Sequence, residues 1–264
     1  MGWKERDDVM PEIIVALDYP DARQALRLVD DLGPEADFFK VGLELFIREG
    51  PPIVEALGDR GKRVFLDLKL HDIPNTVASA VRSAAALGVD LLTVHLGGGE
   101  SMLRAAAEAA AAAEGVEALE ATGPDDPGAQ PGLRLLGVTV LTSLPVTEVE
   151  EVWGREISSL RDEVLRLAEL GHQCGLRGLV ASAKEAEDLR RRFGPGTLIV
   201  TPGIRPAGSE THDQERVATP GGAVRAGADR LVVGRSNPQA PDPLQAIRGI
   251  QGEADAAARE EADA

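Results

Sequence analysis

A short apolar segment in the first third of the chain ends in charged residues of both signs. Residues 63–68 have the composition of a strand, and Asp67, Lys69 and Asp72 lie at its end. Because side chains alternate along a strand, we expect Asp67 and Lys69 to point the same way, with Asp72 joining them as the chain leaves the strand. Bringing several charged side chains close together is unfavourable unless they are paired. Such clusters are common in active sites. The spacing therefore indicates a catalytic charge cluster, with a surface salt bridge as the simpler alternative.

The composition limits the class of protein. The chain has 264 residues, of which 43% are hydrophobic, enough for one large core. Its formal net charge of −16 argues against nucleic-acid and anionic membrane partners, which need a basic surface. No apolar run approaches the roughly 18 residues of a membrane span, residues 1–10 lack the apolar core of a signal peptide, and Cys174 is the single cysteine. We therefore expect a soluble, cytoplasmic protein.

Eight short apolar segments, each followed by a helical pattern, run through the chain. The predicted strands are residues 13–17, 38–41, 63–68, 91–95, 135–141, 178–181, 198–201 and 230–233. Near-continuous apolar strands are typical of a parallel sheet covered on both faces. Their number, order and length predict a single-domain α/β protein, a (β/α)8 TIM barrel over residues 13–252, with a doubly wound open sheet as the alternative. Residues 1–12 would form an N-terminal extension, and residues 253–264 an acidic flexible tail.

Helical spacing accounts for most of the intervening sequence. The predicted helices are residues 22–32, 43–57, 74–88, 105–120, 157–174, 183–193, 215–226 and 242–252. The stretch 105–132 is rich first in Ala and Glu and then in Pro and Gly, which indicates a helix and a solvated loop without a chemical role. Because it joins a helix to the next strand, it should lie on the barrel face opposite the C-terminal strand ends.

A barrel would bring the polar residues at its C-terminal strand ends onto one rim. These residues are Asp18, Lys40, Asp67, Lys69, Asp72, Thr142 and Arg235. Each alone could be a cap or a surface ion, but their shared placement favours one site. Gly234 and Arg235 follow the eighth strand, where barrels often hold a phosphate; a turn with an exposed arginine is the alternative. The polar loop 202–214 is long enough to act as a lid.

The segment Asp67-Leu68-Lys69-Leu70-His71-Asp72-Ile73-Pro74-Asn75-Thr76 resembles the D-x-K-x-H-D-I-P-N-T signature of the orotidine 5′-phosphate decarboxylase family. Other strand ends are similar to that family's motifs, so the resemblance covers nearly the whole chain; they are Val15–Asp18, Phe39–Gly42, Gly137–Ser143, Thr201–Arg205 and Val233–Arg235. One departure is His95-Leu96-Gly97-Gly98-Gly99, which replaces the small-residue pattern usual after the fourth-strand histidine. We expect His95 to be a satisfied structural residue. The other departure is the stretch before the fifth strand, which is longer than usual.

The resemblance implies a carboxy-lyase that converts orotidine 5′-phosphate to uridine 5′-phosphate, the last step of de novo UMP biosynthesis, without a cofactor or a metal ion. It implies a homodimer with shared active sites, in which Lys69 stabilises the carbanion and donates the proton. By resemblance, the catalytic array is Asp67, Lys69, Asp72 and Lys40. The other implied substrate-binding residues are Asp18 at the ribose, Thr142 and Pro202 beside the substrate, Arg205, Gln214, Gly234 and Arg235 at the phosphate and lid, and Asp72, Ile73 and Thr76 reaching into the partner's site.

Two other readings are compatible with part of the pattern. Related barrels use D-x-K-x-x-D to hold Mg²⁺ and stabilise an enediolate, as 3-keto-gulonate phosphate decarboxylases and hexulose phosphate synthases do, and carboxylates suit that ion. A non-catalytic barrel that senses a nucleotide could keep Gly234 and Arg235, because a fold does not determine a function. It would have little reason to keep Asp67, Lys69 and Asp72 together.

Overall fold

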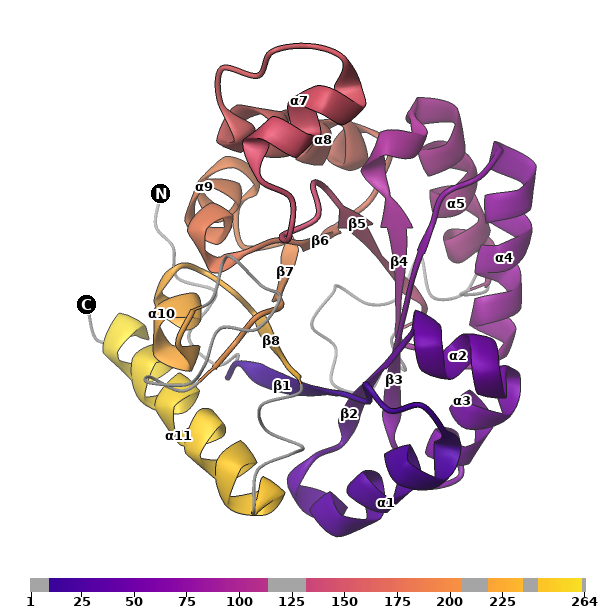
Figure 1. The fold of residues 1–264 in the computed structure, drawn as a ribbon, viewed down its shortest axis with the longest axis vertical. Coiled ribbons are helices and arrows are strands. Elements are labelled where there is room, and N and C mark those ends of the chain that lie inside the picture. The colour runs from indigo at the N-terminus through magenta and orange to yellow at the C-terminus, as the bar shows by residue number, and fades with distance from the viewer. Residues whose placement is uncertain (1–9, 114–131, 206–217, 235–241, 263–264) are drawn as a thin grey trace.

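Eight parallel strands close into a barrel in the order in which they follow one another along the chain (Figure 1). The computed structural model describes residues 10–113, 132–205, 218–234 and 242–262. The predicted (β/α)8 barrel is therefore confirmed, and the open-sheet alternative is wrong. The strands are β1 Glu12–Ala16, β2 Phe38–Gly42, β3 Arg63–Leu70, β4 Leu91–His95, β5 Arg134–Val138, β6 Gly178–Val180, β7 Leu198–Thr201 and β8 Arg230–Val233.

Helices surround the barrel and cover its outer face (Figure 1). Helix α1 (Ala22–Leu32) shows why, since its buried residues Ala25, Leu28, Val29 and Leu32 form one apolar stripe. No helix in the described ranges is long and apolar enough to cross a membrane. The described helices are α1 Ala22–Leu32, α2 Leu43–Glu49, α3 Pro51–Gly58, α4 Pro74–Ala86, α5 Glu100–Ala113, α7 Val146–Trp153, α8 Leu160–Gln173, α9 Ala183–Phe193, α10 Pro220–Arg225 and α11 Pro243–Ala262, with 3₁₀ turns at Gly33–Glu35 and Leu96–Gly98.

The core has two layers, because alternate residues of each strand face the barrel interior and the helices. Ile14 belongs to the inner cluster and Val15 to the outer one, and both are buried. This double burial explains the near-continuous apolar strands of the sequence. The inner cluster is Ile14, Ala16, Phe38, Phe65, Leu91, Leu136, Leu198, Val200 and Val232.

Charged side chains close the barrel at the N-terminal ends of the strands. Glu12 lies 2.6 Å from Arg63 and 2.5 Å from Arg230, measured between carboxylate oxygen and guanidinium nitrogen. Both guanidinium groups lie over the ring of Phe38, at 4.4 and 5.2 Å from its centroid. Burial alone would raise the pKa of Glu12, but the two arginines outweigh it and lower that pKa. This end is a structural plug, which leaves the opposite rim for chemistry.

Several boundaries differ from the prediction for local reasons. The predicted helix 43–57 is divided into α2 and α3, because Gly50 has a φ of 64° and Pro51 begins a new helix. Strand β5 ends at Val138 instead of residue 141, because its partner β6 has only three residues to pair with it. Helix α10 begins at Pro220, where Thr219 accepts a hydrogen bond from the Gly222 amide.

Two helical segments of the structure were not predicted from the sequence. Helix α7 was not predicted, since its apolar residues recur over only eight positions. Helix α11 continues to Ala262 instead of ending at 252, so the expected acidic tail is helical as far as that residue. Ala254 and Ala257 are buried, and the Glu253 carboxylate accepts a hydrogen bond from the Gly221 amide at 3.1 Å. Packing against α10 thus stabilises a segment whose composition suggested solvent.

Candidate active site

The end of β3 positions two of the predicted catalytic side chains through an irregular backbone. Lys69 has a φ of 50°, and among the described residues it is the non-glycine residue with positive φ. Leu66 pairs with Leu92 and Leu70 with Val94, so the β3 register shifts in between. The Lys69 ammonium nevertheless lies 2.8 and 2.9 Å from the two carboxylate oxygens of Asp67. The expected proximity of these two side chains is confirmed, although the strand that supports it is not regular.

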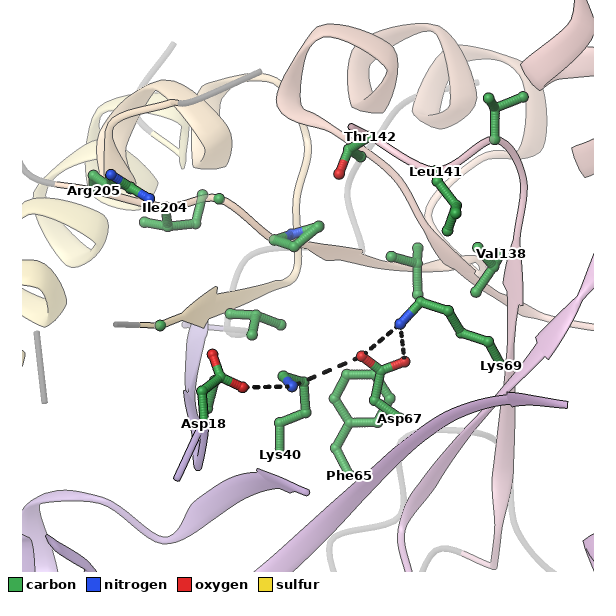
Figure 2. A pocket seen from close by; sticks show the side chains of 17 residues that line it. Asp18, Lys40, Phe65, Asp67, Lys69, Val138, Leu141, Thr142, Ile204 and Arg205 are labelled. Atoms are coloured by element: carbon green, nitrogen blue, oxygen red, sulfur yellow. Dashed lines mark hydrogen bonds and ion pairs between the residues drawn. The ribbon is translucent and has the colours of Figure 1, made fainter. Parts of the chain in front are cut away.

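Four charges of alternating sign form a row across the ends of β1, β2 and β3 (Figure 2). The Lys40 ammonium lies 3.3 Å from Asp18 and 3.8 Å from Asp67, and Lys69 completes the row beyond Asp67. Lys40 and Asp67 are only 13% and 15% exposed, so their interaction is less screened than that of a surface pair. Each inner charge is flanked by opposite charges, which is what allows four ions to share one small volume.

The row borders a pocket of about 210 Å³ at the C-terminal ends of the strands. Eight residues predicted as site residues line it: Asp18, Lys40, Asp67, Lys69, Thr142, Pro202, Arg205 and Gly234. The apolar remainder of the wall was not predicted, because these residues look like any other core residue in the sequence: Ala16, Phe65, Val138, Val140, Leu141, Val180, Ile204 and Val232. The pocket is therefore a largely apolar cleft with the four-charge row along one side.

The predicted phosphate residues lie partly within the described chain. Figure 2 shows Arg205 on the side of the pocket away from Lys69. Arg205 is buried, and its backbone amide donates to the carbonyl oxygen of Ala218. A Cβ on Gly234 would lie 3.4 Å from the Asp18 carboxylate, so this glycine keeps the wall open beside the charge row. Gln214 and Arg235 lie outside the described residues.

The structure does not bring Asp72 to the other predicted charges within one chain. Among the described residues, Asp72, Ile73 and Thr76 are exposed and are absent from the pocket lining. The Asp72 carboxylate accepts a hydrogen bond from the Ile73 amide at 2.6 Å, just before α4 begins at Pro74. The chain turns into this helix instead of continuing along the pocket, so the expectation that Asp72 joins Asp67 and Lys69 is not met in a single copy.

His95 differs from the satisfied structural histidine that was expected. Its ring stacks on His71 with centroids 5.3 Å apart. Its Nδ1 atom is buried and has no hydrogen-bond partner in the part of the chain that the structure describes. Burial lowers the pKa of His95, with smaller contributions from the charges of His71 and Lys69, so the ring is mostly neutral at pH 7. It does not line the pocket.

Thr93 is a polar residue of the site that the sequence did not single out. It is fully buried on β4, and its hydroxyl contacts both the Lys69 amide and the Asp67 carboxylate. Within an apolar strand, one threonine carries no sequence signal of such a role, since the contact depends on the register shift in β3.

Across the described ranges, no group of three or more His, Cys, Asp or Glu side chains is arranged to hold a metal ion.

Fold and site together are those of a (β/α)8-barrel enzyme, with a charged pocket at the C-terminal rim where such barrels carry their active sites. A family model described as "Orotidine 5′-phosphate decarboxylase / HUMPS family" matches residues 11–250. The chain belongs to that family.

Curated relatives and a solved structure agree with this membership. An orotidine 5′-phosphate decarboxylase of Moorella thermoacetica is 48% identical, over 92% of this chain and 91% of the relative. One from Halorhodospira halophila is 49% identical, over 94% of this chain and 97% of the relative. The crystal structure of orotidine 5′-phosphate decarboxylase from Lactobacillus acidophilus superposes with a TM-score of 0.77 at 34% identity and covers 92% of this chain and 98% of its own.

Proposed function

We propose that this protein converts orotidine 5′-phosphate to uridine 5′-phosphate and CO2, the step that completes UMP biosynthesis, and that it does so without a cofactor. The observation that carries the proposal is the alternating row Asp18–Lys40–Asp67–Lys69 beside an apolar pocket. Its relatives of matching length bear the name of this enzyme. The single cysteine, which allows no disulfide within the chain, favours a cytoplasmic location.

Loss of CO2 from C6 of the pyrimidine leaves an electron pair in the plane of the ring, where the ring cannot delocalise it. Stabilisation must therefore come from charges fixed beside that carbon. Lys69 has the positive charge and the proton for this role: as the bond to the carboxyl carbon breaks, the electron pair at C6 accepts a proton from the ammonium group. The lysine then regains a proton from solvent, so atoms and charges balance.

Asp67 has two roles in the proposed mechanism. Its carboxylate holds the Lys69 ammonium through both oxygens. It would also lie beside the carboxylate of the substrate, and their repulsion is larger in the ground state than after CO2 begins to leave. Lys40, between Asp67 and Asp18, keeps both carboxylates in place, and Asp18 accepts a hydrogen bond from a ribose hydroxyl.

The phosphate is bound at the side of the pocket away from Lys69. Support comes from the buried Arg205 and from Gly234, both in the pocket wall. Thr142 and Pro202 would contact the remainder of the substrate. Gln214 and Arg235 are assigned to the phosphate and the lid from the sequence alone. Binding energy from this remote group aligns C6 with Lys69, which raises the rate of the chemical step.

A homodimer would complete the site. Ile73 is 67% exposed, and Leu43 and Ile47 are exposed apolar residues on α2, which follows β2. Such residues suit an interface between two copies. In the proposed dimer, Asp72, Ile73 and Thr76 of one copy reach the pocket of the other, so that Asp72 becomes a neighbour of Asp67 and Lys69 across the interface.

Ultraviolet absorbance tests the proposed function directly. Purified protein is mixed with orotidine 5′-phosphate in the presence of excess EDTA, and we expect loss of substrate with formation of uridine 5′-phosphate. A folded sample that leaves the substrate unchanged contradicts the proposal. Addition of Mg²⁺ and a keto-sugar phosphate then separates a metal-dependent enzyme of the same family from a barrel that binds nucleotides without turnover.

A further inference from the structure

One buried hydroxyl links the backbone of Lys69 to the carboxylate that holds its side chain. The Thr93 side chain on β4 has no exposed surface. The Lys69 amide lies 2.8 Å from its oxygen, and that oxygen lies 3.0 Å from Oδ1 of Asp67. Oδ1 also accepts a hydrogen bond from the Lys69 ammonium at 2.8 Å. A closed circuit of hydrogen bonds therefore joins the two ends of Lys69 through Thr93 and Asp67.

The direction of each hydrogen bond in this circuit is fixed by chemistry. A backbone amide can only donate, so the Thr93 oxygen accepts from Lys69. The hydroxyl proton is then free for the Asp67 carboxylate, which can only accept when ionised. One hydroxyl thus satisfies a buried amide and orients an anion at the same time.

The register shift in β3 explains why a side chain is needed at this point. Asp67, Leu68 and Lys69 lie opposite the single residue Thr93, between the pairs that Leu66 and Leu70 form with β4. Lys69 therefore does not take the regular place in the ladder, and the Thr93 hydroxyl accepts its amide instead. At this point Lys69 has the left-handed φ of 50°, and its ammonium group contacts Asp67.

We propose that Thr93 is a positioning residue for the decarboxylation: its hydroxyl fixes the Asp67 carboxylate and the Lys69 backbone so that the ammonium group stays aimed at C6. This inference rests on the proposed function. Thr93 does not line the pocket, so it acts through Asp67 and Lys69 and not on the substrate. Its loss should impair the chemical step and leave substrate binding largely intact.

The test compares Thr93→Val, which keeps the shape and removes the hydroxyl, with Thr93→Ser, which keeps the hydroxyl. We expect Thr93→Val to lower kcat on orotidine 5′-phosphate by about 100-fold, since small misplacements of a catalytic group have effects of that order. KM and the Kd for uridine 5′-phosphate should stay close to those of the wild type. Thr93→Ser should retain most of the wild-type kcat.

Thr197→Val is the matched control, because it removes another buried threonine hydroxyl that has no hydrogen-bond partner in the described ranges. It should keep the wild-type kcat. A Thr93→Val enzyme with wild-type kcat, or a Thr93→Ser enzyme as impaired as Thr93→Val, overturns the inference. If Thr93→Val does not fold, Thr93→Cys replaces it, because a thiol is a weaker hydrogen-bond donor than a hydroxyl. A kcat of Thr93→Cys equal to that of Thr93→Ser would then contradict the positioning role of the Thr93 hydroxyl. An inactive wild type would instead refute the proposed function.

Discussion

Asp67 is the residue at which most contacts of the site converge. Its carboxylate accepts hydrogen bonds from the Lys69 ammonium and the Thr93 hydroxyl, and it lies 3.8 Å from the Lys40 ammonium. These partners compensate the unfavourable burial of an anion and leave its position well defined. The residue types and their spacing predicted Asp67, Lys69 and Lys40. The role of Thr93 could not be predicted, because it exists only through the positive φ of Lys69 and the register shift.

A half-buried charge, Glu12 at the opposite end of the barrel, leads to a prediction about stability. Its pKa is lowered by Arg230 and Arg63, against the opposing effect of burial. A lowered pKa in the folded state contributes stability at a pH above the ordinary glutamate value of about 4.3, and this contribution is lost as the pH falls through the folded value. Glu12→Gln should lower the free energy of unfolding by about 2 kcal/mol at pH 7, between the values for exposed and buried pairs.

Urea denaturation at a series of pH values measures this difference. The difference in the free energy of unfolding between wild type and Glu12→Gln should narrow as the pH falls from the ordinary glutamate value of about 4.3 through the lowered pKa of folded Glu12. Glu35→Gln is the control, because Glu35 forms an exposed pair with Arg248 and should show no measurable loss. A gap that is independent of pH would contradict the account of Glu12.

At the scale of elements, periodicity predicted the eight strands, but it could not predict where packing lengthens or shortens an element. The last helix is the clearest case. Residues 253–262 are mostly Ala, Glu and Asp, and their sequence suggests a solvated tail. In the fold they extend α11, because Ala254 and Ala257 are buried in a helix that packs against α10. Short alanine side chains give little signal in a hydrophobic pattern, although they allow two helices to approach closely.

The packing of α11 predicts opposite outcomes for two nearby substitutions. Ala254 is fully buried, whereas Ala256 is exposed on the same helix. Ala254→Glu should lower the free energy of unfolding by about 1–3 kcal/mol, because it places a charge at a fully buried position. Ala256→Glu should leave stability nearly unchanged. Thermal unfolding followed by circular dichroism measures both, and equal effects would mean that this segment is not packed.

At the scale of the whole molecule, the barrel separates structural charge from functional charge. The N-terminal strand ends carry the plug of Glu12, Arg63 and Arg230, and the C-terminal ends carry the row of alternating ions. This division follows from the parallel closed sheet, so the sequence could predict the rim at which the site lies. The spacing of the charges alone placed Asp72 beside Asp67 and Lys69, whereas Asp72 turns away from the pocket of its own copy; only the family resemblance implied that it reaches a partner's site.

In the proposed dimer, Lys69 performs the decarboxylation in an array completed by Asp72 of a second copy. The most direct measurement is orotidine 5′-phosphate turnover by Lys69→Ala, by Asp72→Ala and by a mixture of the two after subunit exchange. Each variant alone should lose nearly all turnover and still bind uridine 5′-phosphate, while Lys184→Ala, at an exposed position on α9, stays active.

The mixture should recover roughly a quarter of wild-type turnover, since random pairing in a two-fold dimer gives half of the dimers one intact site. Substantial turnover by Lys69→Ala alone would remove Lys69 from the role of proton donor. A mixture that stays inactive after verified exchange would contradict the action of Asp72 across the interface.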